Sequence, residues 1–187
     1  HHCMKMKSFF IAAMAITIFF TACEQNGKKI PGINSSTGHP DTATAKKQIA
    51  AVLDSFNLAA AAADYERYFN YFTEDATFNG TDATENWNRE TFKVWAKPYF
   101  DKKTTWNFTA IERNIYFGKN ADIAWFDELL NTQMKICRGS GVVVKQGNEW
   151  KVQQYVLSTT IPNNHLDTVI KIKSATEDAV INKLTGK

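Results

Sequence analysis

Histidine and cysteine, the residues used most often for metal binding and nucleophilic catalysis, are scarce in this sequence. The 187 residues include four His and three Cys. Two of the histidines precede Met4, where we expect the natural chain to start, and this leaves His39 and His165. No His/Cys group has the spacing of a zinc site, so neither a metal nor a cofactor is expected. Cys137 has no histidine nearby in sequence to activate it, and we expect it to be a small apolar strand residue.

The sequence also lacks an excess of either charge. It contains 22 Lys and Arg against 19 Asp and Glu. Removal of the segment before Cys23 would take away Lys5 and Lys7 and no acid, which leaves 22 − 2 = 20 basic residues and a net charge of 20 − 19 = +1. No block of basic residues is present, so nucleic acid is not an expected partner.

The apolar run near the start of the chain is too short to cross a membrane. Ser8–Phe20 has thirteen residues, whereas a spanning helix needs about 20. The run follows Lys5 and Lys7 and ends in FTAC, which is the layout of a secretory signal peptide. FTAC resembles a bacterial lipobox, although Phe20 stands where leucine is usual. We therefore expect export from the cytoplasm and acylation of Cys23, which would anchor the protein by lipid to a membrane of the bacterial cell envelope. Plain secretion is the alternative.

A tether follows Cys23. Its composition is rich in Gly, Pro and Ser up to Asp41, which is typical of a flexible linker. With Cys23 acylated, Cys137 has no cysteine left to pair with, so an intramolecular disulfide is excluded. The predicted organisation is a signal peptide in 1–22, a lipidated cysteine and tether in 23–42, one domain in 43–162 and a C-terminal helix in 163–187.

Three helices are predicted at the start of the domain, over about 43–62, 65–72 and 89–100. Asp64 is placed to cap the second helix, and Pro98 predicts an early end or a kink in the third. Each helix has apolar residues at helical spacing on one face. These faces are Ile49, Val52, Leu53, Phe56 and Ala60; Tyr65, Tyr68, Phe69 and Phe72; and Phe92, Trp95, Ala96 and Tyr99.

Strands dominate after Asp101. A short strand at 76–79 is predicted between the helices, and longer strands follow at 104–117, 122–131, 134–145 and 149–161, rich in aromatic and β-branched residues. The segment NTQ predicts a hairpin turn, and Asn164 with Asp167 resembles a capping box for a last helix ending near Lys183. Helices followed by a run of strands in one chain indicate an α+β fold.

Several features occur in a fixed order along the chain. They are Asp64, FTEDATF at 72–78, the Phe92/Trp95 pair, Trp106, and then ADIAWFDELL, CRGSGVVVK and EWKVQQYVLS. In this order they resemble the SnoaL-like branch of the nuclear transport factor 2-like superfamily, over about Lys47 to Asn163. The resemblance implies a curved antiparallel sheet wrapped around three N-terminal helices, a cone-shaped fold with an apolar pocket, and a homodimer. Family members include isomerases, dehydratases, cyclases and binding domains, so the fold alone does not choose the function.

The hairpin WFDELLNTQMKICRGSGVVV carries charges among its apolar residues. If it turns about Thr132-Gln133, facing residue numbers sum to about 265, which places Asp127 opposite Arg138 on one face. The pair is either a structural ion pair or a pocket carboxylate oriented by Arg138. A slip of one residue would pair Glu128 instead and reverse the faces.

Two functions stay open at this point. The first is a non-catalytic protein that binds a small apolar molecule or a protein partner in the pocket. The second is a lyase or isomerase in which Asp127 is the general base. The lack of a histidine on the pocket strands favours the first. The residues expected to contact a ligand are Tyr68, Phe72, Trp95, Trp106, Trp125, Arg138 and Tyr155.

Overall fold

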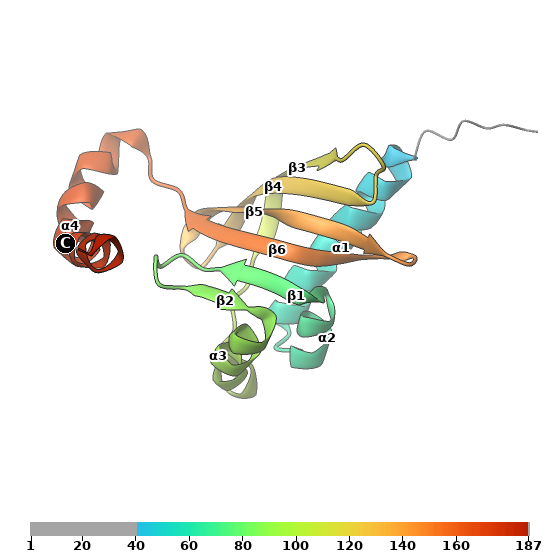
Figure 1. The fold of residues 1–187 in the computed structure, drawn as a ribbon, viewed down its shortest axis with the longest axis horizontal. Coiled ribbons are helices and arrows are strands. Elements are labelled where there is room, and N and C mark those ends of the chain that lie inside the picture. Colours follow the sequence, from blue (N-terminus) through green and yellow to red (C-terminus); the bar gives the residue numbers. More distant parts are fainter. Residues whose placement is uncertain (1–40, 187) are drawn as a thin grey trace, which may run out of the picture. The chain divides into compact units, whose positions relative to one another are not determined.

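The computed structural model describes residues 41–186, so the expected signal peptide, Cys23 and most of the tether lie outside the described residues. The elements run in the order α1 (Thr42–Ala61), α2 (Tyr65–Asn70), β1 (Phe72–Asn79), β2 (Asn86–Asn88), α3 (Arg89–Asp101), β3 (Thr109–Phe117), β4 (Ile123–Thr132), β5 (Lys135–Gln146), β6 (Glu149–Thr159), a 3-10 turn (Asn163–His165) and α4 (Leu166–Thr185) (Figure 1). The predicted α+β class, with a curved sheet, three N-terminal helices and a C-terminal helix, is confirmed.

One six-stranded sheet organises the domain, in the order β2-β1-β6-β5-β4-β3. Strands β3 to β6 form an antiparallel meander, as predicted. Strand β1 instead pairs in parallel with β6, and β2 pairs with β1 in antiparallel fashion. Helix α1 packs against β3 and β6, and α3 packs against β1 and β2 (Figure 1).

Side-chain caps start the first three helices. Asp41 accepts a hydrogen bond from Thr44 N at 3.1 Å, Asp64 accepts one from Arg67 N at 3.2 Å, and Asn88 accepts one from Thr91 N at 2.9 Å. These oxygens satisfy backbone N–H groups that have no partner within the first turn. The predicted role of Asp64 is therefore confirmed.

Three local predictions are wrong. Strand β2 was not foreseen, because three residues are too few to show a periodicity. Pro98 neither ends nor shortens α3, which continues to Asp101. Pro98 has no N–H to donate to the Val94 carbonyl, so the helix continues past it with one backbone hydrogen bond fewer. No side chain caps α4, so the Asn164/Asp167 capping box is absent and a 3-10 turn precedes the helix instead.

Aromatic side chains fill the space between the helices and the sheet. Phe56 of α1 stacks on Tyr68 of α2 with ring centroids 4.5 Å apart, and Phe72 meets Phe56 edge-on at 5.2 Å. Tyr155 of β6 lies 5.6 Å from Phe56 and is 1 % exposed. The space between α1, α2 and the sheet is thus filled by a packed aromatic core.

The register of the β4–β5 hairpin decides which charges face this core. Asp127 pairs with Ser140 and Leu129 with Arg138, so paired residue numbers sum to 267. The even-numbered residues of β4 are buried from Ala124 to Thr132, while the odd-numbered ones lie on the outer face. Asp127 and Arg138 share a face, as predicted, but Arg138 lies opposite Leu129 and not opposite Asp127, and that face is turned away from the core.

No helix within residues 41–186 combines the length and apolar character needed to span a bilayer.

Candidate ligand-binding site

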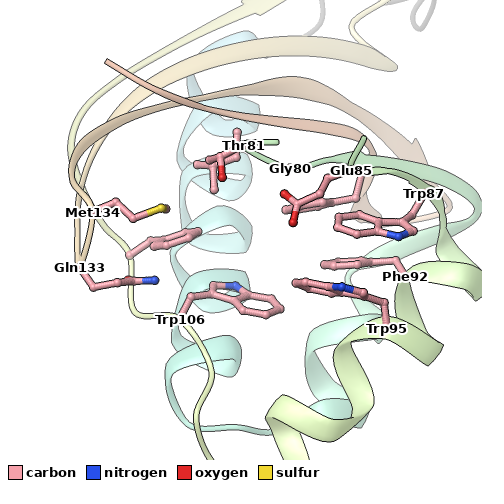
Figure 2. Close-up of a pocket in the computed structure, with 12 residues that line it drawn as sticks. Gly80, Thr81, Glu85, Trp87, Phe92, Trp95, Trp106, Gln133 and Met134 are labelled. Carbon is pink, nitrogen blue, oxygen red and sulfur yellow. The ribbon is translucent and has the colours of Figure 1, made fainter. Parts of the chain in front are cut away.

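An aromatic cavity of about 150 Å³ lies where five segments of the chain meet. These segments are the end of β1, the β1–β2 loop with β2, helix α3, the segment from Trp106 to Phe108, and the β4–β5 turn with the end of β6 (Figure 2). The lining residues are Phe78, Gly80, Thr81, Glu85, Trp87, Phe92, Trp95, Trp106, Phe108, Gln133, Met134 and Leu157. Most of the lining is therefore aromatic or aliphatic.

The rings on one side of the cavity are stacked. The Trp87 ring lies 4.6 Å from that of Trp95 and 5.4 Å from that of Phe92, and Phe92 stacks on Phe78 at 4.3 Å. Stacking at these separations holds each ring in place without a hydrogen bond. Trp106 is 6.1 Å from Phe92, and Figure 2 shows it across the cavity from Glu85. The wall is thus preformed by contacts among the lining residues.

Burial varies around the cavity. Phe78, Phe92, Phe108 and Leu157 are buried and belong to the hydrophobic core. Thr81, Gln133 and Met134 are exposed, and they form the rim on the opposite side from the stacked rings (Figure 2). An apolar floor with a few polar groups at the rim is the usual construction of a small-molecule site.

Glu85 is the only charged residue that the described part of the chain contributes to the lining. Its Oε2 accepts a hydrogen bond from the backbone N–H of Asp82 at 3.2 Å. A side chain at Gly80 would collide with Oε2 and would lie 2.9 Å from Glu85 Cβ. Glycine at position 80 therefore makes room for the carboxylate, which Figure 2 shows directed into the cavity.

A separate cluster of polar side chains lies buried in the core, outside the cavity. The Glu128 side chain is fully buried, and its Oε2 accepts from Arg113 Nε at 2.7 Å while Oε1 accepts from the Tyr155 hydroxyl at 2.8 Å. Arg113 continues to α1, where it donates to the Ala50 carbonyl at 3.1 Å and to Asp54 at 2.9 Å. This network, Glu128–Arg113–Tyr155, ties β3, β4 and β6 to α1.

The network also sets the protonation of its members. Burial raises the pKa of the Tyr155 phenol well above 10.0, and the Glu128 carboxylate raises it further. Burial opposes the charge on Arg113, but the carboxylates of Glu128 and Asp54 outweigh it and raise the pKa of the guanidinium. Because the folded pKa of Tyr155 lies above the unfolded value, its contribution to stability is complete below about pH 10 and is lost as the pH rises through the folded pKa.

Two glycines of β5 make the network and its packing possible. A Cβ at Gly139 would collide with the Tyr155 hydroxyl and would lie 3.1 Å from Glu128 Cγ. A Cβ at Gly141 would collide with the Gln154 carbonyl oxygen and would lie 2.9 Å from the Phe126 ring. Glycine is needed at both positions because neighbouring atoms lie too close to leave room for a Cβ. Backbone conformation is not the reason, since neither residue has a positive φ.

The structure separates the predicted site residues into three groups. Trp95 and Trp106 line the cavity. Tyr68, Phe72 and Tyr155 are buried in the aromatic core and do not line it. Trp125, Asp127 and Arg138 lie on the outer face of the sheet, where Trp125 is 48 % exposed.

The expectation that Asp127 and Arg138 lie at the mouth or floor of the cone is therefore corrected. They form an ion pair at 3.8 Å, but their side chains are 35 % and 53 % exposed. The physical reason is that β4 has apolar residues on both faces, and the face with Ala124, Phe126 and Leu130 is the one packed against the core. Glu128 shares that inner face and is neutralised there by Arg113.

The sequence interpretation did not identify Glu85, Trp87, Gln133 or Met134 as lining residues. Trp87 lies on the unforeseen strand β2, Gln133 was predicted to lie in a turn, and Met134 was predicted to begin a strand. The sequence did contain one signal for the position of Trp87. Trp87 and Phe92 are the apolar residues on either side of Asn88, the polar cap of α3. This spacing is typical of a helix start with apolar contacts on either side of its cap.

Comparison with known proteins gives a family and a fold. A family model described as SnoaL-like domain matches residues 49–162. No curated protein matches this chain. Among solved structures, an NTF2-like protein of unknown function from Pseudomonas putida is 12% identical, covers 65% of this chain and 90% of its own, and has a TM-score of 0.56.

Two further structures are similar. A protein with a cystatin-like fold from Nostoc punctiforme is 16% identical, with 63% of this chain and 92% of that chain covered and a TM-score of 0.51. A protein provisionally named as a dehydratase of the NTF2-like family from Streptomyces avermitilis is 12% identical, with 65% and 99% covered and a TM-score of 0.56. At these identities the similarity establishes the fold alone.

Proposed function

The chain belongs to the SnoaL-like domain family, and from this premise we propose that it binds a small apolar molecule in the aromatic cavity, while a lipid on Cys23 anchors it to a membrane. The observation that carries the binding proposal is the preformed cavity between Trp87, Trp95 and Trp106. Its aromatic wall offers a large apolar contact area, and its rim offers few polar groups for orientation.

The positions of Asp127 and Glu128 argue against either of them as a general base in this cavity. The predicted general base Asp127 lies on the outer face of the sheet, away from the cavity. Glu128 faces inward but is held by Arg113 and Tyr155 and does not line the cavity. A general base must reach its substrate directly or through one water. A lyase or isomerase using Asp127 would therefore lack a substrate pocket at that residue.

Substitution of Trp106 by leucine is expected to weaken ligand binding. The change removes one wall of the cavity but keeps an apolar side chain against the core, where Trp106 is half-buried. With benzyl alcohol as a neutral aromatic probe, Kd should rise about tenfold or more, which corresponds to ~1.4 kcal/mol. Ligand-observed saturation-transfer NMR on the full chain measures this.

Trp125→Leu is the matched control, because this exposed tryptophan lies on the outer face of the sheet. Its Kd for benzyl alcohol should equal that of the unaltered protein. Equal loss of binding in both variants, or no saturable binding to the unaltered protein, would contradict the proposed function. Far-UV circular dichroism of each variant confirms that the fold is retained.

The proposed lipid anchor is supported by Lys5 and Lys7, the thirteen-residue apolar run and the FTAC ending. Cys23→Ser removes the thiol that would carry the lipid and is expected to release the protein from the membrane fraction. Fractionation of cells and the intact mass of the protein measure the result. Unchanged mass and unchanged fractionation would reject the anchor. The homodimer implied by the family resemblance stays a prediction.

A further inference from the structure

Among residues 41–186, the aromatic cavity has a single charge, and that charge has no ion-pair partner. Glu85 is the only ionisable residue that these residues contribute to the lining. None of the ion pairs among residues 41–186 includes it. The other carboxylates near the core behave differently, since Glu128 is bound by Arg113. An unpaired carboxylate beside an apolar cavity gives that cavity a negative potential.

The carboxylate is also held in position for a ligand. The hydrogen bond from Asp82 N fixes Oε2 at 3.2 Å, and the missing side chain at Gly80 gives the carboxylate its place beside the cavity. Oε1 accepts no hydrogen bond from the described residues. One oxygen is therefore anchored by the loop, and the other is available to a group inside the cavity (Figure 2).

The rings around Glu85 add to the preference for positive charge. The indole rings of Trp87, Trp95 and Trp106 line the same cavity as the carboxylate (Figure 2). The faces of indole rings carry negative charge density and attract ammonium groups within about 6 Å of the ring centroid. Carboxylate and rings thus favour the same sign of charge in a ligand.

We propose that the ligand of this cavity is a small organic cation, with an ammonium group at Glu85 and an apolar body among the tryptophans. This proposal rests on the proposed binding function and names its ligand class. An anionic ligand would be repelled by the carboxylate, and a neutral one would form no ion pair with it. The cavity volume of about 150 Å³ is below the ~300–1,000 Å³ of sites for drug-sized ligands, so the ligand has about one ring or a short alkyl chain.

The test compares three probes of nearly the same shape. Benzylamine is a cation at pH 7, benzyl alcohol is neutral and benzoate is an anion. Each is titrated into the full chain at low salt, and binding is followed by tryptophan fluorescence and by ligand-observed NMR. Benzylamine is expected to bind about tenfold tighter than benzyl alcohol, and benzoate to bind most weakly.

Glu85→Gln removes the charge and keeps the shape of the side chain. In this variant the affinity for benzylamine should fall about tenfold, to that of benzyl alcohol, while the affinity for benzyl alcohol stays the same. Glu74→Gln is the matched control, because Glu74 is exposed on β1 and does not line the cavity. It should change neither affinity.

The outcomes separate this proposal from the proposed function. If benzyl alcohol binds as tightly as benzylamine, or if Glu85→Gln leaves benzylamine binding unchanged, the preference for a cation is overturned and the binding function stands. If none of the three probes binds saturably, both are overturned.

Discussion

Replacement of Arg113 by methionine is expected to lower the free energy of unfolding by about 3–5 kcal/mol. The variant leaves the carboxylate of Glu128 fully buried and without its cation. Removal of one partner of a buried ion pair is costly because the remaining charge is neither solvated nor neutralised. The substitution also removes the hydrogen bonds from Arg113 to Ala50 and Asp54, which join β3 to α1.

Urea unfolding followed by tryptophan fluorescence measures this loss. Arg138→Met is the matched control, since Arg138 also pairs with an aspartate of β4 but on the outer face, where its side chain is 53 % exposed. Exposed pairs contribute about 0–1 kcal/mol. A similar loss in both variants would show that Glu128 is not the buried partner of Arg113.

A double variant tests whether the unpaired charge of Glu128 causes the loss of stability in Arg113→Met. Adding Glu128→Gln to Arg113→Met removes the buried charge and leaves an amide oxygen that accepts from Tyr155. At least about half of the lost stability should return, because the unpaired charge accounts for most of the cost. No recovery would mean that the loss comes from packing around Arg113 alone.

Gly141→Ala is expected to destabilise the fold by about 3 kcal/mol or more. The added methyl would collide with the Gln154 carbonyl oxygen and would press on the Phe126 ring. Overpacking of a core usually costs about 1–3 kcal/mol, and the cost is at the upper end where the contacted atom is backbone. Gln154 is paired in the ladder between β5 and β6, so its carbonyl cannot move away from the added methyl without disturbing that pairing.

Ser140→Ala is the control for this prediction. Ser140 is the neighbouring residue, its side chain lies on the outer face, and removal of its hydroxyl adds no atom to the core. Its effect should be within about 0.5 kcal/mol. Thermal or urea unfolding of both variants measures the difference, and a tolerated Gly141→Ala would show that β5 and β6 separate at little cost.

Helices and strands could be predicted from the sequence because their apolar spacing is regular. The predicted helix over 43–62 is α1 at Thr42–Ala61, and the predicted strand over 149–161 is β6 at Glu149–Thr159. The inward face of β4 could not be chosen in the same way. Ile123, Trp125 and Leu129 on one face are as apolar as Ala124, Phe126 and Leu130 on the other, and each face carries one acid. On the inner face, Arg113 of the neighbouring strand β3 supplies the cation that the buried Glu128 needs.

The candidate site was harder to predict than the fold. Trp95 and Trp106 were identified because large aromatics near a helix and a strand are conspicuous, and both line the cavity. Glu85 lies in a polar loop whose composition looks like solvent-exposed turn. Its role depends on Gly80, five residues earlier, and on rings from α3 and from the segment before β3. Such an arrangement is set by tertiary packing and has no local sequence pattern.

The parallel pairing of β1 with β6 has a consequence for how the chain folds. Thr73 and Gln153, joined by a hydrogen bond across this pair, are 80 residues apart in the sequence. The meander from β3 to β6 and the pairing of β1 with β2 need only short loop closures, whereas the pairing of β1 with β6 needs a long one. Long-range pairing of this kind raises the contact order of a domain and slows its folding. The unit of β1, β2 and α3, which carries Glu85 and one wall of the cavity, therefore joins the sheet only when the last strand is in place.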